Sequence, residues 1–174
     1  MVDALFIIPG NAQGLYQKLS EDYSEIKTPT WALLLAESCR SKGYKVGIID
    51  VNAEKLTHQE ALDRVVGISP RFTVFVVYGQ NVNAGTTNMS GATALSKFFK
   101  SSDLDSPIIY IGSHVQALPI ESLEKEESID IVCTNEGVYA LWNLLKINRV
   151  NPVALSKVNG IGYRDFDSIK LTNP

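Results

Sequence analysis

The stretch ALFIIPGNAQG, residues 4–14, contains the first predicted strand of this chain and its first candidate binding loop. Its apolar run stops at Pro9 and Gly10, and Gly14 follows after small or polar residues without charge, beginning with Asn11. Proline and glycine interrupt strand pairing, and a glycine lets another group approach the backbone closely. We therefore expect a buried first strand that ends in a ligand-binding loop.

Apolar runs of strand length recur along the chain. They lie at residues 4–8, 45–50, 72–77, 107–111 and 129–133. Several are continuously apolar rather than alternating, which is typical of parallel strands covered by helices on both faces. We predict an α/β fold, an open five-stranded parallel sheet with helices on both faces, of the Rossmann or flavodoxin-like type.

Helical patterns fill the intervals between these strands. Thr28 and Pro29 give a helix start signal, and the helix that follows ends near Gly43. We expect one face of that helix to begin with Trp31, Leu34, Leu35 and Ser38. Further helices are predicted over residues 57–67, with Leu62, Val65 and Val66 on one face, around 89–99, and from Glu136 to Leu145.

The pattern changes after residue 148. Residues 159–164 and 168–171 resemble two short strands joined by a turn around Asp165, which predicts a C-terminal β-hairpin. The last three residues resemble the start of a linker. We predict an α/β domain over residues 1–148, and a hairpin with a linker over residues 149–174.

Composition and charge exclude several function classes. The 16 basic and 19 acidic side chains give a net charge of -3 without a basic cluster, so we expect no nucleic-acid partner. No stretch approaches the roughly 18 apolar residues of a membrane span, and the N-terminus lacks a signal-peptide pattern. Cys39 and Cys133 are too far apart for a zinc ribbon or a redox dithiol, so we expect them to pack as small apolar side chains. Together these features predict a cytoplasmic protein without a membrane partner.

Ligands of open α/β sheets bind beyond the carboxyl ends of the strands, and four loops occupy that edge here. They are rich in glycine, amide and hydroxyl residues, which favours a large neutral or amide-bearing ligand over a phosphate alone; the alternative is that glycine and asparagine only form turns. The candidate contacts are Pro9, Gly10, Asn11 and Gly14 in the first loop, Tyr78, Gly79, Gln80 and Asn81 in the second, Gly112, Ser113, His114 and Val115 in the third, and Asn135, Glu136 and Gly137 in the fourth.

Three familiar ligand sites do not fit these loops. Gly10 and Gly14 have the wrong spacing for the G-x-G-x-x-G of a dinucleotide site. A phosphorylated receiver domain needs acids and a lysine where Pro9, Tyr78 and Thr134 stand. A flavodoxin-type phosphate loop needs a run of hydroxyl residues after the first strand, which is also missing.

Four stretches follow the motifs of one known family. Thr28–Ala36, continuing to Gly43, Val46 and Asp50, resembles P-P-x-G-L-x-x-L-A-A…G-x-x-V…D; Ile111–Pro119 resembles G-G-x-H-x-x-x-x-P; Ile129–Gly137 resembles V-D-x-V-V-x-G-E-G-E; and Gly160–Arg164 resembles G-L-x-Y-R. In this order the motifs belong to the N-terminal cobalamin-binding domain of radical S-adenosylmethionine enzymes. Over nearly its whole length the chain is similar to that domain.

The resemblance implies cobalamin as the cofactor, held by the four loops. Many cobalamin-binding domains carry D-x-H-x-x-G after the first strand, and this frame falls on residues 9–14, so Asn11 stands where a cobalt-ligating histidine would be. The S-x-L and G-G of those domains fall on residues 78–80 and 112–113. An amide cannot match imidazole as a ligand, so we expect no lower imidazole ligand from this loop. The resemblance implies that a weak lower ligand favours methyl transfer from cobalt. We expect His114 to make an ordinary hydrogen bond rather than to ligate cobalt.

The resemblance also implies a further domain. The chain has no C-x-x-x-C-x-x-C motif, so a 4Fe-4S cluster and S-adenosylmethionine would belong to a downstream radical S-adenosylmethionine domain of the same polypeptide. We expect Met1 to be the natural N-terminus and the chain to be a catalytically incomplete piece that ends before that barrel. We assign it neither catalytic residues nor metal ligands.

Two alternatives stay open from the sequence. One is a cofactor-free domain of the same fold that acts as an interaction or substrate-recognition module, which the bulk of Tyr78 and Gln80 favours. The other is an unrelated α/β enzyme acting on a nucleotide or a sugar. It is disfavoured because the sequence lets us place no acid–base pair at the loop edge.

Overall fold

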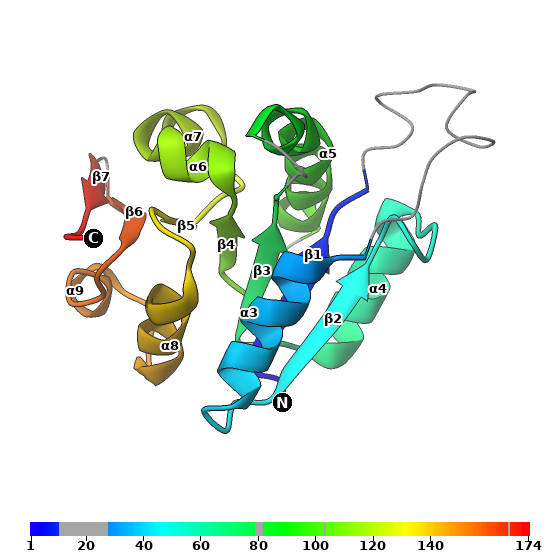
Figure 1. Cartoon of the computed structure of the whole chain (residues 1–174), viewed down its shortest axis with the longest axis horizontal. Coiled ribbons are helices and arrows are strands. Elements are labelled where there is room, and N and C mark those ends of the chain that lie inside the picture. Colours follow the sequence, from blue (N-terminus) through cyan, green and yellow to red (C-terminus); the bar gives the residue numbers. More distant parts are fainter. Residues whose placement is uncertain (11–27, 79–81, 103, 167) are drawn as a thin grey trace.

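The computed structural model describes residues 1–10, 28–78, 82–102, 104–166 and 168–174, and within them seven strands form one sheet (Figure 1). The strands are β1 (Ala4–Ile8), β2 (Val46–Asp50), β3 (Phe72–Val76), β4 (Ile108–Ile111), β5 (Ile131–Cys133), β6 (Ile161–Asp165) and β7 (Ser168–Leu171). The helices are α3 (Thr30–Arg40), α4 (His58–Ile68), α5 (Val82–Ser101), α6 (Ser113–Ala117), α7 (Pro119–Lys125), α8 (Val138–Lys146) and α9 (Pro152–Leu155).

The first five strands are parallel and follow the order β2-β1-β3-β4-β5. This confirms the predicted open parallel sheet of the flavodoxin-like type. The chain passes from β1 to β2 on one side and then returns to β3 on the other side of β1. Strand order therefore reverses between β1 and β3, and the ends of these two strands flank the position where doubly wound sheets bind ligands.

The C-terminal hairpin is present and extends the same sheet. β6 pairs antiparallel with β5, with Ile131 opposite Tyr163, and β7 pairs antiparallel with β6. The guanidinium of Arg164 donates to the carbonyl oxygens of Leu123, Glu126 and Ile129, which fixes the hairpin against α7 and the turn before β5. The boundary at residue 148 stays a prediction.

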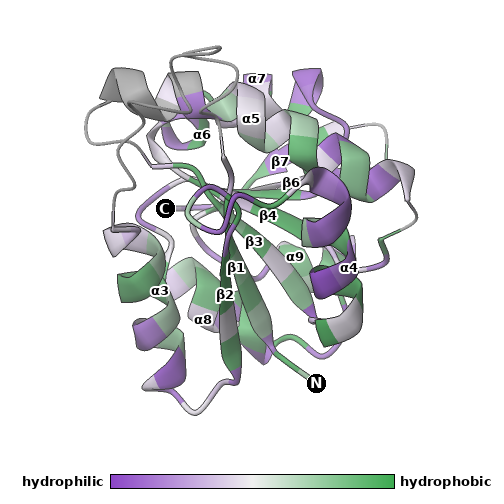
Figure 2. Cartoon of the chain, turned by 90° about the vertical axis from the view of Figure 1, so that its right-hand side faces the viewer, coloured by the Kyte–Doolittle hydropathy of each residue, from purple (hydrophilic) through white to green (hydrophobic). Residues whose placement is uncertain are grey.

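Two apolar layers cover the sheet, as the continuously apolar strands predicted. On one face α3, α8 and α9 pack over residues such as Phe6, Val74 and Ile109. On the other face α4, α5, α6 and α7 pack over residues such as Leu5, Phe75 and Tyr110. Figure 2 shows the strands as the hydrophobic centre of the molecule, with hydrophilic residues on the outer sides of the helices.

The inward face of α3 differs from the predicted one. It consists of Ala32, Leu35, Ala36 and Cys39, whereas Trp31 is 42% and Leu34 57% exposed. Small side chains let the helix approach the sheet closely, which turns the bulkier residues outward. Val66 of α4 was also expected on a buried face, and it is 57% exposed.

Two predicted loop regions have different boundaries in the structure. Residues 113–117, expected as loop, form the short helix α6. The helix expected from Glu136 begins instead at Val138, because Gly137 caps it with a positive φ of 85°. Both cysteines are buried and free, as predicted. None of the helices in the described ranges is long and apolar enough to cross a membrane.

Candidate functional site

The carboxyl ends of the parallel strands bring together parts of all four predicted loops. β1 ends before Pro9 and Gly10, and β3 ends shortly before Tyr78. The backbone of Gly10 lies beside Asn52, the second residue after β2; a Cβ built on Gly10 would sit 3.5 Å from the Cα of Asn52. Five predicted contacts lie outside the described residues: Asn11, Gly14, Gly79, Gln80 and Asn81.

Tyr78 stacks on Trp31 at this edge. The two ring centroids are 4.6 Å apart, with 21° between the ring planes. The backbone carbonyl of Tyr78 accepts a hydrogen bond from the side chain of Asn88 on α5, at 3.3 Å. The stack therefore joins the first turn of α3 to the end of β3, beside the point where strand order reverses.

The hydroxyl of Tyr78 is buried and has no hydrogen-bond partner among the described residues. Burial, followed by the negative charge of Glu136 and the neighbouring Cys133 thiol, raises the pKa of Tyr78 to about 12. The hydroxyl thus stays protonated and can donate a hydrogen bond. Leaving a buried hydroxyl without a partner costs about 1–3 kcal/mol of free energy. A ligand atom that accepted a hydrogen bond from this hydroxyl would remove that cost and so bind more tightly.

The third loop forms the turn into α6. The hydroxyl of Ser113 is buried and also lacks a partner within the described part of the chain. His114 Nδ1 lies 3.2 Å from the hydroxyl of Thr86 on α5, a hydrogen bond between neighbouring helices. The side chain of Val115 is fully buried in the core, so only its backbone could face a ligand.

Gly112 is required by packing between strands. A Cβ at this position would lie 2.3 Å from the carbonyl oxygen of Val77, at the end of β3. Contacts under 3.0 Å are essentially never tolerated by a real side chain, so any other residue would push the ends of β3 and β4 apart. This glycine shapes the edge without having to touch a ligand.

The fourth loop has mainly structural contacts. Asn135 Oδ1 accepts the backbone N–H of Gly137 at 2.9 Å, and its amide packs against Gly160 before β6. Glu136 is exposed, and its charge acts on the Tyr78 hydroxyl. Of this loop, Glu136 is therefore the residue whose side chain is free to meet a ligand.

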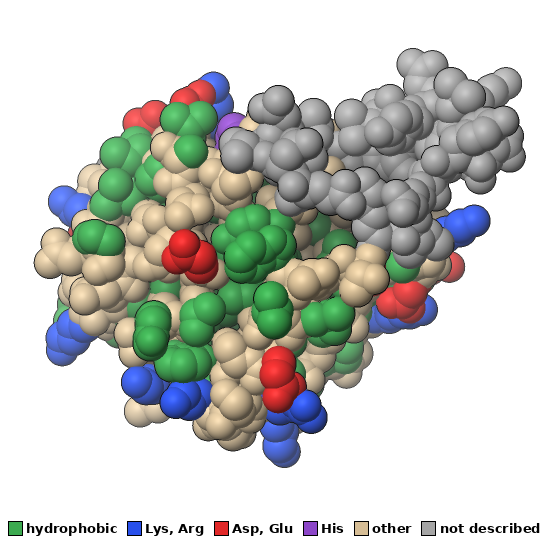
Figure 3. Space-filling model, viewed as in Figure 1, with side chains coloured by type: hydrophobic (Ala, Val, Ile, Leu, Met, Phe, Trp, Pro, Cys, Tyr) green, Lys and Arg blue, Asp and Glu red, His purple; other side chains and the backbone are tan. Residues whose placement is uncertain are grey.

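Trp31 lies at the candidate site, although its sequence pattern did not predict it there. Its place at helical spacing made it an expected core residue, but in Figure 3 hydrophobic side chains gather in the middle of the face that carries α3 and α8. Trp31, Leu34 and Tyr139 are exposed residues of these two helices. The signal was the run Ala32-Leu33-Leu34-Leu35-Ala36, which has too many apolar residues for one inward face.

Together these groups form a mostly uncharged edge. Within the described ranges it offers the hydroxyls of Tyr78 and Ser113, which are buried without a partner there, an aromatic stack and the exposed carboxylate of Glu136. Among the described residues no three His, Cys, Asp or Glu side chains are grouped so that they could hold a metal ion. The edge can donate hydrogen bonds to neutral oxygen acceptors and can present an aromatic face to a flat ligand.

Comparison with known proteins gave matches to solved structures. No protein-family model and no curated protein matches the chain. The cobalamin-dependent S-adenosylmethionine radical enzyme OxsB, with aqua-cobalamin and S-adenosylmethionine bound, aligns with 99% of the chain at 19% identity and a TM-score of 0.71. The radical S-adenosylmethionine methyltransferase TsrM from Kitasatospora setae aligns with 100% of it at 13% identity. The TM-score is 0.74 for TsrM with its tryptophan substrate and the S-adenosylmethionine analogue aza-SAM bound, and 0.72 for TsrM with cobalamin and a [4Fe-4S] cluster bound.

These alignments cover almost all of this chain but a minor part of the solved ones. The chain spans 22% of OxsB and 30% or 31% of TsrM. At such low identity the likeness establishes the fold: the chain, hairpin included, folds like one part of these cobalamin-dependent radical enzymes.

Proposed function

We propose that this chain is the cobalamin-binding domain of a radical S-adenosylmethionine enzyme, most specifically a methyltransferase, and that it holds cobalamin without a histidine lower ligand. The observation that carries the proposal is the likeness of the entire fold to two cobalamin-dependent radical enzymes. The 4Fe-4S cluster and S-adenosylmethionine would belong to a downstream domain of the same polypeptide.

The residues at the carboxyl edge fit such a cofactor. The rim of a corrin ring carries amide side chains, whose carbonyl oxygens accept hydrogen bonds without requiring a charged partner. The hydroxyls of Tyr78 and Ser113 are buried donors that lack an acceptor within the described residues. A corrinoid seated at the switch point between β1 and β3 would supply acceptors to both.

Each element has a separate role in this proposal. Gly112 lets the ends of β3 and β4 meet, Tyr78 and Ser113 donate to the corrinoid rim, and the outer face of Trp31 excludes water from one side. Asn11 replaces the histidine expected below cobalt, and His114 already shares a hydrogen bond with Thr86. When bound, cobalamin would supply a transferable methyl group, and the protein would supply binding and orientation.

One observation favours the second candidate, a cofactor-free interaction module of the same fold. Tyr78 and Trp31 fill space at the end of β3, where a smaller residue would leave room for a ligand. On this reading the stack is part of a closed surface, and the exposed apolar residues of α3 and α8 would meet another protein.

The two candidates differ in a simple binding experiment. The full chain is incubated with excess hydroxocobalamin, desalted, and examined by visible absorption. Cobalamin binding predicts close to one equivalent of retained corrinoid, with Gly112→Ala losing it and Gly67→Ala, a matched change in an open position of α4, keeping it. If the wild-type chain retains no corrinoid, the cofactor-free module is the better account.

A further inference from the structure

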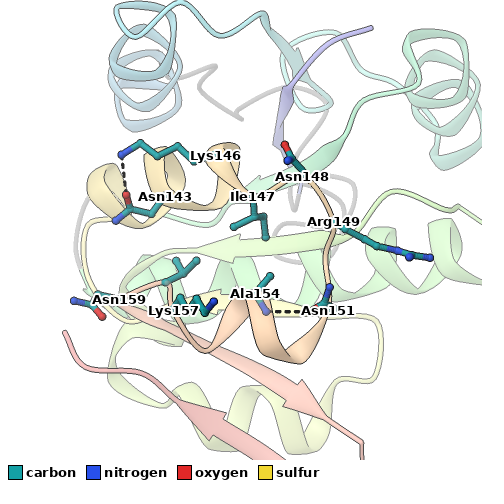
Figure 4. Close-up of a pocket in the computed structure, with 10 residues that line it drawn as sticks. Asn143, Lys146, Ile147, Asn148, Arg149, Asn151, Ala154, Lys157 and Asn159 are labelled. Carbon is teal, nitrogen blue, oxygen red and sulfur yellow. Dashed lines mark hydrogen bonds between the residues drawn. The ribbon is translucent and has the colours of Figure 1, made fainter.

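A pocket lies away from the carboxyl edge, between α8 and the segment that contains α9 (Figure 4). Its volume is about 520 Å³, within the range of roughly 300–1,000 Å³ found for small-molecule sites. The lining comes from the last turns of α8, the connection over residues 147–151, and residues 154–159. Nothing in the proposed cobalamin site uses these residues.

The polar lining of this pocket donates hydrogen bonds and carries positive charge. Lys146, Arg149 and Lys157 line it together with four asparagines, and no aspartate or glutamate does. The chain as a whole has a net charge of -3, so this local excess of positive charge runs against the overall balance. Such a pocket favours an anionic ligand.

Two of the asparagines have their oxygen atoms already engaged. Asn151 Oδ1 accepts the backbone N–H of Ala154 at 2.9 Å, and Asn143 Oδ1 accepts from Lys146 Nζ at 3.2 Å; both bonds are drawn in Figure 4. Each amide therefore has its NH₂ group left for other contacts. An NH₂ group donates only, so these two positions can bind an acceptor.

The cations of this pocket differ from most others in the described chain. Six lysines or arginines there form ion pairs with carboxylates, and none of the six lines this pocket. Within the described residues, the side chains of Arg149 and Lys157 have neither a hydrogen-bond nor an ion-pair partner. In Figure 4, Lys146 runs along α8 toward Asn143, Lys157 comes from the segment on the opposite side of the pocket, and the guanidinium of Arg149 extends outward at the rim.

We propose that this pocket binds a small organic phosphate, a phosphate ester with two or more negative charges. Phosphate oxygens accept hydrogen bonds from ammonium and amide groups. No carboxylate among the lining residues competes with a phosphate for these donors. The volume exceeds the needs of a bare phosphate, and the side-chain amides can contact the neutral part of the ligand. The site is independent of the cobalamin site, so either proposal can fail without the other.

The test is a titration of the ¹⁵N-labelled full chain with ADP at low salt, followed through the side-chain NH₂ signals of its asparagines. We expect shifts at Asn143 and Asn151 with a Kd below about 1 mM, and about tenfold weaker binding in Lys146→Ala/Lys157→Ala. The control Lys45→Ala/Lys170→Ala removes two charges from exposed lysines outside the pocket and should bind like the wild type.

Two further probes separate the parts of the ligand. Pyrophosphate should bind more weakly than ADP, and adenosine should not bind measurably. The proposal is overturned if ADP shifts none of these signals, if both double variants lose affinity equally, if pyrophosphate binds as tightly as ADP, or if adenosine does.

Discussion

Trp31 and Tyr78 lie face to face, with ring centroids 4.6 Å apart, although 46 residues separate them in the chain. Their stack joins the start of α3 to the end of β3, at the edge where the order of the parallel strands reverses. The hydroxyl of Tyr78 is buried and has no partner among the described residues. A stacked ring therefore holds a buried donor at the place where the fold binds its ligands.

Tyr78→Phe should separate stability from binding. The change removes a buried hydroxyl that has no partner in the described part of the chain, so the free energy of unfolding should stay equal or rise by about 1 kcal/mol. The affinity for hydroxocobalamin should fall severalfold, because one donor to the corrinoid is lost. Urea unfolding and equilibrium dialysis measure the two quantities. A loss of stability of more than 1 kcal/mol would mean that the hydroxyl already has a structural partner.

Trp31→Ala should weaken corrinoid binding severalfold, because it removes the ring that stacks on Tyr78 and that, in the proposed function, shields one side of the corrinoid; an aromatic pair contributes about 0.5–1.5 kcal/mol beyond its buried area. Tyr139→Ala is the matched control, because Tyr139 is a 71% exposed aromatic residue on the same side of the sheet. Absorption titration of both variants gives the comparison. Equal losses of affinity in the two variants would remove Trp31 from the site.

Gly112→Ala should destabilise the fold by about 2 kcal/mol or more, because the new methyl group would meet the carbonyl oxygen of Val77 at 2.3 Å. Gly67→Ala should stabilise it by about 0.5–1 kcal/mol, since a Cβ on this exposed residue of α4 meets nothing within 4 Å. Thermal or urea unfolding compares both with the wild type. Similar stabilities of the two variants would contradict the close contact between β3 and β4.

The free energy of unfolding should fall as the pH rises above about 9. Burial raises the pKa of Cys39 to about 11 and that of Cys133 to about 12, from an ordinary value of 9.0. Because the unfolded chain releases these protons first, the stabilisation is complete below pH 9 and is lost progressively up to the raised values. The slope from each thiol is at most about 1.4 kcal/mol per pH unit.

Urea unfolding at several pH values measures this slope, and Cys39→Ala/Cys133→Ala is the control. The double variant should show a shallower decline between pH 9 and pH 11, whatever its stability at neutral pH. A decline as steep as that of the wild type would show that the thiols do not contribute to it.

Much of the fold could be predicted because the strands carry their own signal. Continuous apolar runs such as 72–77 indicate burial on both faces, and this is where β3 lies. The side chains that point outward from helices were harder to predict. Trp31 and Val66 both fit a helical period. In α3, however, Ala32 and Ala36 face the sheet because the helix packs closely against it, and periodicity alone does not show how closely a helix packs.

The candidate site was predicted by position better than by role. The sequence placed Tyr78, Gly112 and Asn135 in loops that the sheet brings to one edge, and Ser113, also expected in a loop, begins α6 at that edge. It could not show that Gly112 allows the close contact with Val77, because that contact joins residues far apart in the sequence. Nor could it show that the side chain of Asn135 accepts the backbone N–H of Gly137 and so stabilises its own turn. That the hydroxyls of Tyr78 and Ser113 are buried without a partner among the described residues could be recognised only from the structure around them.

The most direct test of the central claim is electron paramagnetic resonance of the ¹⁵N-labelled full chain after loading with unlabelled cobalamin and reduction to the cobalt(II) state. A protein imidazole below cobalt would split the signal into ¹⁵N doublets, whereas the unlabelled base of the cofactor would give ¹⁴N triplets. With Asn11 in place of histidine and His114 engaged by Thr86, we predict a bound cobalt(II) signal without ¹⁵N splitting. A ¹⁵N doublet that disappears in His114→Gln would contradict the account and make His114 the lower ligand.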